Sequence, residues 1–464
     1  MLKDLFSPHA VAIIGASQDP TKIGNAILRN MIDSGYKGNI IPINPSSQEV
    51  MGLRFYPSID KVDDTPELAV IALPASRTID ALKGCVERGV KFVIIIAGGF
   101  SELGKEGRDR ELQLLDIIKG TDTRIIGPNT LGVYFPHIGV NTALTSPGRM
   151  AFLPKGEIAF VSQSGALGLL TMDGVSEYNV GISAFLNLGN RVDLNEVELL
   201  DYFAADELTK SIVLYLESVP KGREFFSKVK EITMKKPVVV LKSGRTEESA
   251  VAASLHTGAM ASDDAVVNGA ISQAGAVRAY DETEMMDFGR VLAYSGRISG
   301  DRIAIITTAG GVGVITADYI SSKVNGIGMR LASLSDETKR RIREVVVPFA
   351  SVNNPIDLTA DGSVDNFDKV IGILEEDDEV DGIIAYPLPQ TPKMGVGVVD
   401  VINKYKGGRK PIIVGVLGSK IAKELIIEFE KRKIPAYPSV HRTVKALEAL
   451  RSYSRYVERR RGSR

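Results

Sequence analysis

The chain has 464 residues, of which 44% are hydrophobic and 24% are charged, and its formal net charge is −1. This balance is typical of a globular protein and gives no reason to expect a nucleic-acid partner or an acidic membrane surface. The single cysteine excludes an internal disulfide, no apolar run approaches the ~20 residues that cross a bilayer, and the N-terminus lacks a signal-peptide pattern. We therefore expect a cytoplasmic protein of about three domains.

Short apolar runs alternate with amphipathic stretches along the whole chain. Continuously apolar, β-branched runs are typical of strands that are buried on both faces of a parallel sheet. Between them, segments such as 77–88 have helical spacing, so the pattern predicts an α/β fold built from βα units. Glycine and serine interrupt the pattern near 147–148 and 294–300, which predicts domains at 1–145, 146–295 and 296–464. The apolar runs that are predicted to be strands include residues 10–14, 68–73, 92–96, 158–161, 212–216 and 303–306.

The first predicted strand leads into a glycine- and serine-containing turn and then a helix over 25–34. A strand, such a turn and a helix form the usual frame for binding a pyrophosphate. The turn is not Gly-x-Gly-x-x-Gly, and the second strand ends at Asn44 with no acidic residue to bind a ribose hydroxyl. NAD is therefore unexpected, and a nucleotide with more phosphate charge, such as coenzyme A, fits better. The candidate residues of this turn are Gly15, Ala16, Ser17, Lys22 and Gly24.

Further turns of the first domain fall where other predicted strands end. Ligands of open parallel sheets bind at the carboxyl ends of the strands, so these turns extend the candidate site. Each turn alone is a weak signal, because glycine and proline also serve in tight turns without any ligand. Together with Asn44, the candidate residues are Pro74, Ala75, Ala97, Gly98 and Asn129.

The second and third domains are predicted to be copies of one unit. Residues 158–165 match 303–310, 212–217 match 383–388, and 236–240 match 410–414. The copies differ in length, because the stretch from Pro237 to Tyr280 is 17 residues longer than that from Pro411 to Tyr437. His256 lies in this additional segment, among small residues that favour neither helix nor strand.

The two copies also differ in their polar residues. Leu388 stands in the third domain where Glu217 stands in the second, and Thr308-Ala309 replaces Gln163-Ser164. Polar groups that only one copy needs are poor candidates for scaffold roles. We therefore interpret His256 and Glu217 as candidates for chemistry rather than for folding.

The turn that follows residues 158–161 should open a helix whose N-terminal N–H groups can bind an anion. The alternative is a plain helix cap, since serine caps many helices. Beside a histidine and a carboxylate, phosphate is the favoured ligand. A neutral imidazole can act as a base or be phosphorylated, and the small-residue segment favours the phosphocarrier role, with Glu217 orienting the ring. The candidate phosphate-binding residues are Ser162, Gln163, Ser164, Gly165 and Ala166.

These motifs together resemble the succinyl-CoA synthetase superfamily, and most closely the alpha subunit of the ADP-forming acyl-CoA (acetyl-CoA) synthetases. The resemblance rests on residues 15–24, 127–129, 162–165 and 254–259 and extends over nearly the whole chain. It implies a Rossmann-like CoA-binding domain followed by two flavodoxin-like succinyl-CoA-ligase-type domains. It also implies that His256 is the phosphohistidine and Glu217 its orienting acid. Leu255 departs from the pattern, which often has serine before the histidine.

The resemblance further implies the reaction acyl-CoA + ADP + phosphate ⇌ carboxylic acid + ATP + CoA. All three predicted domains are assigned to other folds, so a separate beta subunit with an ATP-grasp domain should bind ADP or ATP with magnesium, in a heterotetramer with two copies of each subunit. No metal site is expected in this chain. The alternatives are a succinyl-CoA synthetase-type ligase, which needs a pocket for a second carboxylate, and a non-catalytic CoA-binding regulatory subunit.

Overall fold

The computed structural model describes residues 2–45, 49–145, 148–249, 263–322 and 327–462. The described residues form two compact units, which we treat separately. Unit 1 comprises Met1–Ser176 and Gly181–Ala274, and unit 2 comprises Glu177–Val180 and Gly275–Arg464. No helix in the described ranges is long and apolar enough to cross a membrane.

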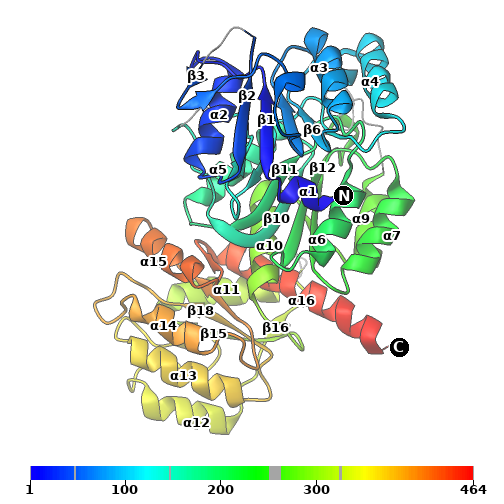
Figure 1. The fold of residues 1–464 in the computed structure, drawn as a ribbon. Coiled ribbons are helices and arrows are strands. Elements are labelled where there is room, and N and C mark those ends of the chain that lie inside the picture. Colours follow the sequence, from blue (N-terminus) through cyan, green and yellow to red (C-terminus); the bar gives the residue numbers. More distant parts are fainter. Residues whose placement is uncertain (1, 46–48, 146–147, 250–262, 323–326, 463–464) are drawn as a thin grey trace. The chain divides into compact units, whose positions relative to one another are not determined.

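Unit 1 begins with a five-stranded parallel sheet in the order β2-β1-β5-β6-β7. Strands β1, β5 and β6 are buried along their whole length, which explains their continuously apolar sequences. Helix α2 connects β1 to β2, whereas α3 connects β5 to β6 toward the opposite edge of the sheet, and Figure 1 shows the two helices on opposite sides of it. The elements are α1 (Leu2–Phe6), β1 (Ala10–Ile14), α2 (Ile23–Asp33), β2 (Asn39–Ile43), the hairpin β3 (Glu49–Val50) and β4 (Leu53–Arg54), β5 (Leu68–Ile71), α3 (Ala75–Glu87), β6 (Phe92–Ile95), α4 (Lys105–Ile118) and β7 (Arg124–Ile126).

A second sheet of unit 1 contains strands in the order β13-β12-β10-β11-β8-β9. Strands β10 to β13 are parallel, while β8 runs antiparallel to β11 and to β9. Strands β8 and β9 precede the boundary predicted near residue 146 yet pair with this sheet. The elements are β8 (Val133–Phe135), β9 (Val140–Asn141), β10 (Lys155–Ser162), α5 (Gly165–Ser176), β11 (Ile182–Asn187), α6 (Glu196–Ala205), β12 (Ser211–Leu216), α7 (Gly222–Ile232), β13 (Val238–Lys242) and α9 (Asp264–Ala274).

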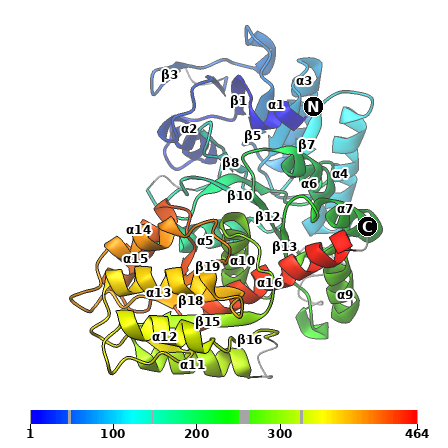
Figure 2. The ribbon, with the colours of Figure 1, turned by 90° about the horizontal axis from the view of Figure 1, so that it is seen from below.

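Unit 2 contains the sheet β16-β15-β18-β19-β20, with β17 also paired to β15. Helices α12, α13 and α14 lie in a row across one face, as Figures 1 and 2 show, and α16 packs against α10 and α11. The elements are β14 (Val277–Ala279), α10 (Glu282–Tyr294), β15 (Arg302–Thr307), α11 (Gly310–Ser321), β16 (Arg330–Leu331), α12 (Asp336–Val345), β17 (Ile356–Asp357), α13 (Val364–Glu376), β18 (Gly382–Tyr386), α14 (Gly397–Lys404), β19 (Ile412–Gly415), α15 (Lys420–Lys431), β20 (Ala436–Tyr437) and α16 (Val440–Gly462).

The three sheets share one topology. In each, a central strand (β1, β10 or β15) is followed in the chain by a neighbour on one side and later by a neighbour on its other side, so each sheet has a point where the chain reverses its direction across the sheet. These points lie between β1 and β5, between β10 and β12, and between β15 and β18. Doubly wound sheets bind ligands at the carboxyl ends of the strands at such a point.

Two lysines with equivalent contacts explain why residues 236–240 match 410–414. Lys236 donates to the carbonyl oxygens of Phe203 and Asp206, and Lys410 donates in the same way to those of Leu374 and Asp377. Each lysine therefore binds the carbonyl end of a helix, where a cation is favoured. Burial lowers the pKa of both ammonium groups.

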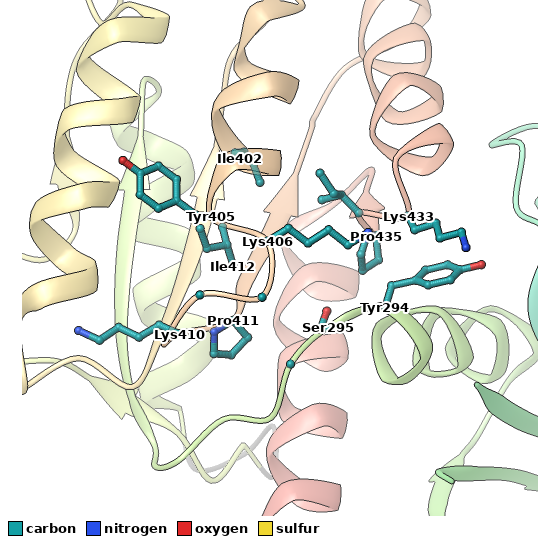
Figure 3. Close-up of a pocket in the computed structure, with 14 residues that line it drawn as sticks. Tyr294, Ser295, Ile402, Tyr405, Lys406, Lys410, Pro411, Ile412, Lys433 and Pro435 are labelled. Carbon is teal, nitrogen blue, oxygen red and sulfur yellow. The ribbon is translucent and has the colours of Figure 1, made fainter. Parts of the chain in front are cut away.

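Lys410 also lines a small cavity of about 40 Å³ in unit 2 (Figure 3). Its side chain points away from those of Lys406 and Lys433 in this view, so the three cations do not converge on one point. Ligand sites usually enclose ~300 Å³ or more, so this cavity is a packing feature rather than a ligand site.

Candidate active site

A cavity of about 1410 Å³ lies where the first sheet reverses its direction, at the carboxyl ends of β1 and β5. Its lining includes ten of the eleven residues that the sequence predicts to bind coenzyme A. The cavity is large enough for a nucleotide with an extended arm, since ligand pockets typically enclose ~300–1,000 Å³. The ten residues are Gly15, Ser17, Lys22, Gly24, Asn44, Pro74, Ala75, Ala97, Gly98 and Asn129.

The glycines of the first turn are explained by close backbone packing. Gly15 has φ of +92°, and a Cβ there would lie 2.6 Å from the carbonyl oxygen of Ala72. A Cβ at Gly24 would lie 2.0 Å from the carbonyl oxygen of Gly15. Only glycine lets the turn, the start of α2 and the end of β5 approach this closely. The positive end of α2 and the exposed Lys22 just before it therefore both lie at the cavity, where an anion is favoured.

Ala16 is the predicted residue that does not line the cavity. It is fully buried, and its carbonyl oxygen accepts a hydrogen bond of 2.7 Å from the Asn44 amide. The lining also contains residues that the sequence did not single out, notably Arg77, Leu131 and Leu144. Arg77 lies in the first turn of α3, shortly after the candidates Pro74 and Ala75, so its cationic side chain was the available signal.

A carboxylate holds the part of the cavity wall that contains Gly98. Glu102 accepts hydrogen bonds from the N–H groups of Gly99 and Phe100, at 2.5 and 3.1 Å, and from the Asn190 amide at 2.7 Å. Burial acts to raise the pKa of Glu102, but these hydrogen bonds outweigh it and lower the pKa. Asn129 in turn donates to Asn190 at 3.3 Å, so the Gly98 and Asn129 turns are joined.

The predicted phosphate turn lies where the second sheet reverses its direction. It connects the end of β10 at Ser162 to the start of α5 at Gly165. Ser162 is fully buried and its hydroxyl donates to the carbonyl oxygen of Ser164 at 2.5 Å, so this hydroxyl serves the turn itself. Ser164 and Gly165 are partly exposed and Ala166 is exposed. The Ser162 hydroxyl is therefore already used within the turn, whereas the start of α5 has the exposed N–H groups that favour an anion.

The side chain of Gln163 connects two turns of the second sheet. Its side-chain oxygen accepts hydrogen bonds from the N–H groups of Glu217 and Ser218, at 2.8 and 3.1 Å. The turns after β10 and β12 are thereby held together. Unit 2 repeats this contact, because Thr308 Oγ1 accepts a hydrogen bond of 3.0 Å from the N–H of Leu388.

Asn187 connects the phosphate turn to the wall of the large cavity, and the sequence prediction missed it. The fully buried amide donates to the carbonyl oxygens of Ser162 and Gln163, at 2.9 and 3.1 Å. Its side-chain oxygen accepts from the N–H of Leu131 at 2.7 Å and from the Thr130 hydroxyl at 3.1 Å. One side chain thus fixes the spacing between the two candidate sites of unit 1.

Glu217 follows β12 directly and is 6% exposed. Its carboxylate accepts a hydrogen bond of 3.4 Å from the Tyr215 hydroxyl, which also lies 3.2 Å from the hydroxyl of Ser243. Burial raises the pKa of Tyr215 and so keeps it protonated as a donor. Ser243 follows β13, on the stretch of chain that leads to residue 250. His256 itself lies outside the described residues.

An ion pair supports the turn that contains Glu217 through the neighbouring residue Ser218. The buried Arg191 pairs with Glu196 at 2.9 Å and donates to the carbonyl oxygen and hydroxyl of Ser218, at 3.1 and 2.7 Å. It therefore supports the turn that carries Glu217. The carboxylate of Asp193, by contrast, binds Arg124 at 2.9 Å and accepts a hydrogen bond of 2.8 Å from the N–H of Ile125.

The close packing of Leu131 and Asn187 against the start of α5 can be tested by substitution of Gly165. A Cβ at Gly165 would lie 2.5 Å from Leu131 Cγ and 3.0 Å from Asn187 Oδ1, whereas one at Gly174 on the same helix would meet nothing within 4 Å. Gly165→Ala should lower the free energy of unfolding by about 1–3 kcal/mol through overpacking. Gly174→Ala should raise it by about 0.5–1 kcal/mol through helix propensity. Denaturant unfolding measures both, and equal effects of the two substitutions would contradict the described packing.

No group of three or more histidine, cysteine, aspartate or glutamate side chains within the described ranges is arranged to hold a metal ion.

Family models match three consecutive parts of the chain. A CoA binding domain matches residues 9–136, a succinyl-CoA ligase like flavodoxin domain matches 155–292, and a ligase-CoA domain matches 303–460. Fold class and order agree with the sequence prediction. The boundaries at 145 and 295 stay a prediction.

The chain is similar to proteins named as ADP-forming acetate–CoA ligases and to a solved acetyl-coenzyme A synthetase. The acetate–CoA ligase [ADP-forming] I subunit alpha of Pyrococcus furiosus is 38% identical over 463 residues, with 98% of each chain covered. The acetate–CoA ligase [ADP-forming] of Methanocaldococcus jannaschii is 37% identical over 98% of this chain but only 63% of its own length. A solved structure of acetyl-coenzyme A synthetase 1 from Ca. Korarchaeum cryptofilum, in complex with phosphate and ADP, is 35% identical, with a TM-score of 0.89 and 99% of each chain covered. The chain therefore belongs to the family of ADP-forming acetate–CoA ligase alpha subunits.

Proposed function

We propose that the chain is the CoA-binding, phosphohistidine-bearing subunit of an enzyme that converts acyl-CoA, ADP and phosphate to a carboxylic acid, ATP and CoA. The observation that carries the proposal is the Asn187 connection. A nucleotide-sized cavity and a helix-capping phosphate turn lie at equivalent points of two sheets, and one buried amide joins them.

In the proposed reaction, phosphate held at the start of α5 attacks the thioester carbonyl of acyl-CoA. The C–S bond breaks, CoA leaves as the thiol, and an acyl phosphate forms. Its phosphoryl group passes to a ring nitrogen of His256, which releases the carboxylic acid. The phosphoryl group then passes from His256 to ADP. N–H groups at the start of α5 stabilise the transferring charge, and Glu217 binds the other ring nitrogen of His256.

The proposed partner is a beta subunit with an ATP-grasp domain, which binds ADP or ATP with magnesium in an α2β2 assembly in the cytoplasm. The M. jannaschii relative has more than a third of its length outside the part that this chain matches. The P. furiosus relative of equal length is by contrast named a subunit.

The experiment that tests the proposal is reconstitution with an ATP-grasp beta subunit. ATP formation is measured from ADP and phosphate with a panel that includes acetyl-, butyryl- and succinyl-CoA. Activity that requires both subunits supports the proposal, and a preference for succinyl-CoA would favour a succinyl-CoA synthetase-type ligase. CoA binding without ATP formation from any acyl-CoA would support a regulatory subunit instead.

Lys22→Ala tests the assignment of the large cavity to CoA. Removing a cation from the start of α2 should weaken CoA binding by about 1–3 kcal/mol, or roughly 5–150-fold in Kd, as for loss of a hydrogen bond to a charged group. Lys37→Ala, at an exposed lysine outside the lining of this cavity, serves as the matched control and should leave Kd unchanged. Titration calorimetry measures both, with NAD as the competing ligand. Saturable NAD binding, or equal CoA affinity of the Lys22 variant and the wild type, would count against the assignment.

A further inference from the structure

Leu131 lies at the junction of the two candidate sites of unit 1. Its side chain lines the large cavity, and its backbone is fixed on both sides. Its N–H donates to Asn187 Oδ1 at 2.7 Å, and its carbonyl oxygen accepts from the N–H of Leu144 at 2.8 Å. Leu144 lines the same cavity. The position of Leu131 is therefore set by the surrounding hydrogen bonds and not by a bound ligand.

The same side chain also contacts the phosphate turn. A Cβ at Gly165 would lie 2.5 Å from Leu131 Cγ and 2.8 Å from Cδ1, so the side chain packs directly on the start of α5. Leu131 is only partly buried, and part of its surface faces the cavity. One apolar side chain thus touches both the space for the thioester and the backbone that holds phosphate.

This geometry restricts where an acyl group can lie. If CoA occupies the large cavity and phosphate occupies the start of α5, the thioester carbonyl must lie between them to be attacked. The group attached to that carbonyl then lies beside Leu131. Because a leucine offers no hydrogen bond and has a fixed volume, its contact with the acyl group is one of size and apolarity.

We propose that Leu131 determines which acyl groups the enzyme accepts, by limiting their size next to the phosphate turn. This inference rests on the proposed function. Shortening this side chain opens space for longer acyl chains, and enlarging it removes space. Leu73 provides a contrast within the same cavity. It lies beside the turn proposed to bind the pyrophosphate, since a Cβ at Gly15 would be 2.8 Å from Leu73 Cδ2.

The experiment compares Leu131→Ala, Leu131→Val and Leu131→Phe with the matched control Leu73→Ala, each reconstituted with the beta subunit. The measured quantity is the ratio of kcat/KM for hexanoyl-CoA to kcat/KM for acetyl-CoA. Leu131→Ala should raise this ratio roughly 10-fold or more, because methylene-sized changes in an apolar pocket alter discrimination by 10–200-fold. Leu131→Val should raise it less, and Leu131→Phe should lower it. Leu73→Ala should weaken free CoA binding and all acyl-CoA substrates alike, leaving the ratio unchanged.

The outcomes separate this inference from the function on which it rests. A wild-type complex that forms no ATP from any acyl-CoA would overturn the proposed function and the role of Leu131 together. An active wild type whose ratio is the same in all three Leu131 variants would overturn the role of Leu131 alone. A ratio that changes equally in the Leu73 and Leu131 variants would do the same, because the effect would then belong to the cavity as a whole. If Leu131→Ala fails to fold, the opposite shifts expected for valine and phenylalanine decide the question.

Discussion

His256→Asn is expected to reduce phosphate labelling of the reconstituted enzyme to background. Wild type should take up label from ATP, or from acyl-CoA and labelled phosphate, in a form that is acid-labile and base-stable, as a phosphorus–nitrogen bond requires. Asparagine keeps a polar side chain of similar size but has no nucleophilic ring nitrogen, so no covalent intermediate can form. ATP formation should be lost with the label. Quantitative labelling of the purified subunit measures the effect.

The matched control is His9→Asn, at an exposed histidine in the first domain, which should label as the wild type does. CoA affinity should be the same in both variants, because the residues that line the large cavity all lie between Ile14 and Leu144, and His9 is not among them. Labelling of the His256 variant at the wild-type level would show that another residue carries the phosphoryl group.

Arg290→Met is expected to lower the free energy of unfolding of unit 2 by about 3–5 kcal/mol, the cost of breaking a buried ion pair by removing one partner. The fully buried guanidinium of Arg290 contacts Glu430 on α15, donates to Asp287 at 2.9 Å and donates to the carbonyl oxygen of Ala436 at 2.8 Å. Asp287 keeps a second cation, since Arg442 binds it at 2.7 Å. Glu430 keeps only the N–H of Ala436, at 3.2 Å, among its described hydrogen bonds. Burial already raises the pKa of Glu430, so its charge is costly without Arg290.

Denaturant unfolding with a probe in unit 2 measures this loss. The matched control is Arg340→Met on α12, where the arginine is exposed and pairs with Glu337 and Glu344 on the surface. That change should cost about 1 kcal/mol or less. The double variant Arg290→Met with Glu430→Met should regain much of the loss, because apolar side chains can replace a buried pair at little cost. A single Arg290 variant as stable as the Arg340 variant would contradict the account.

The fold was predictable because strand burial leaves a direct trace in the sequence. Residues 10–14 were predicted as a strand and are β1, and the helix predicted over 25–34 is α2 at Ile23–Asp33. Parallel strands covered on both faces must be continuously apolar, and the chain shows this at each central strand. Ten of the residues predicted to bind CoA line one cavity for a related reason, since ligands of such sheets lie where the strands end, and their role in binding CoA stays a prediction.

Asn187 and Leu131, which the sequence analysis did not identify, make contacts that no local sequence pattern indicates. Asn187 and Leu131 are 56 positions apart, and their hydrogen bond exists only because the chain between them folds through β8, β9 and β10. Gln163 was predicted to bind phosphate because of its place in a turn, but its side-chain oxygen binds the backbone of a second turn. Ala16 was predicted from its place in a motif, whereas the residue is fully buried and its carbonyl oxygen accepts a hydrogen bond from the Asn44 amide.

The paired turns of the two copies have a consequence for how such an enzyme can change over evolutionary time. In unit 1 a side chain at position 163 binds the backbone N–H of residue 217, and in unit 2 the side chain at 308 binds the backbone N–H of residue 388. Each contact uses the main chain of the second residue and leaves its side chain unspecified. A glutamate can therefore become a leucine there, or the reverse, without loosening the turn. Gain or loss of chemistry in either copy is thus separated from the requirement to fold.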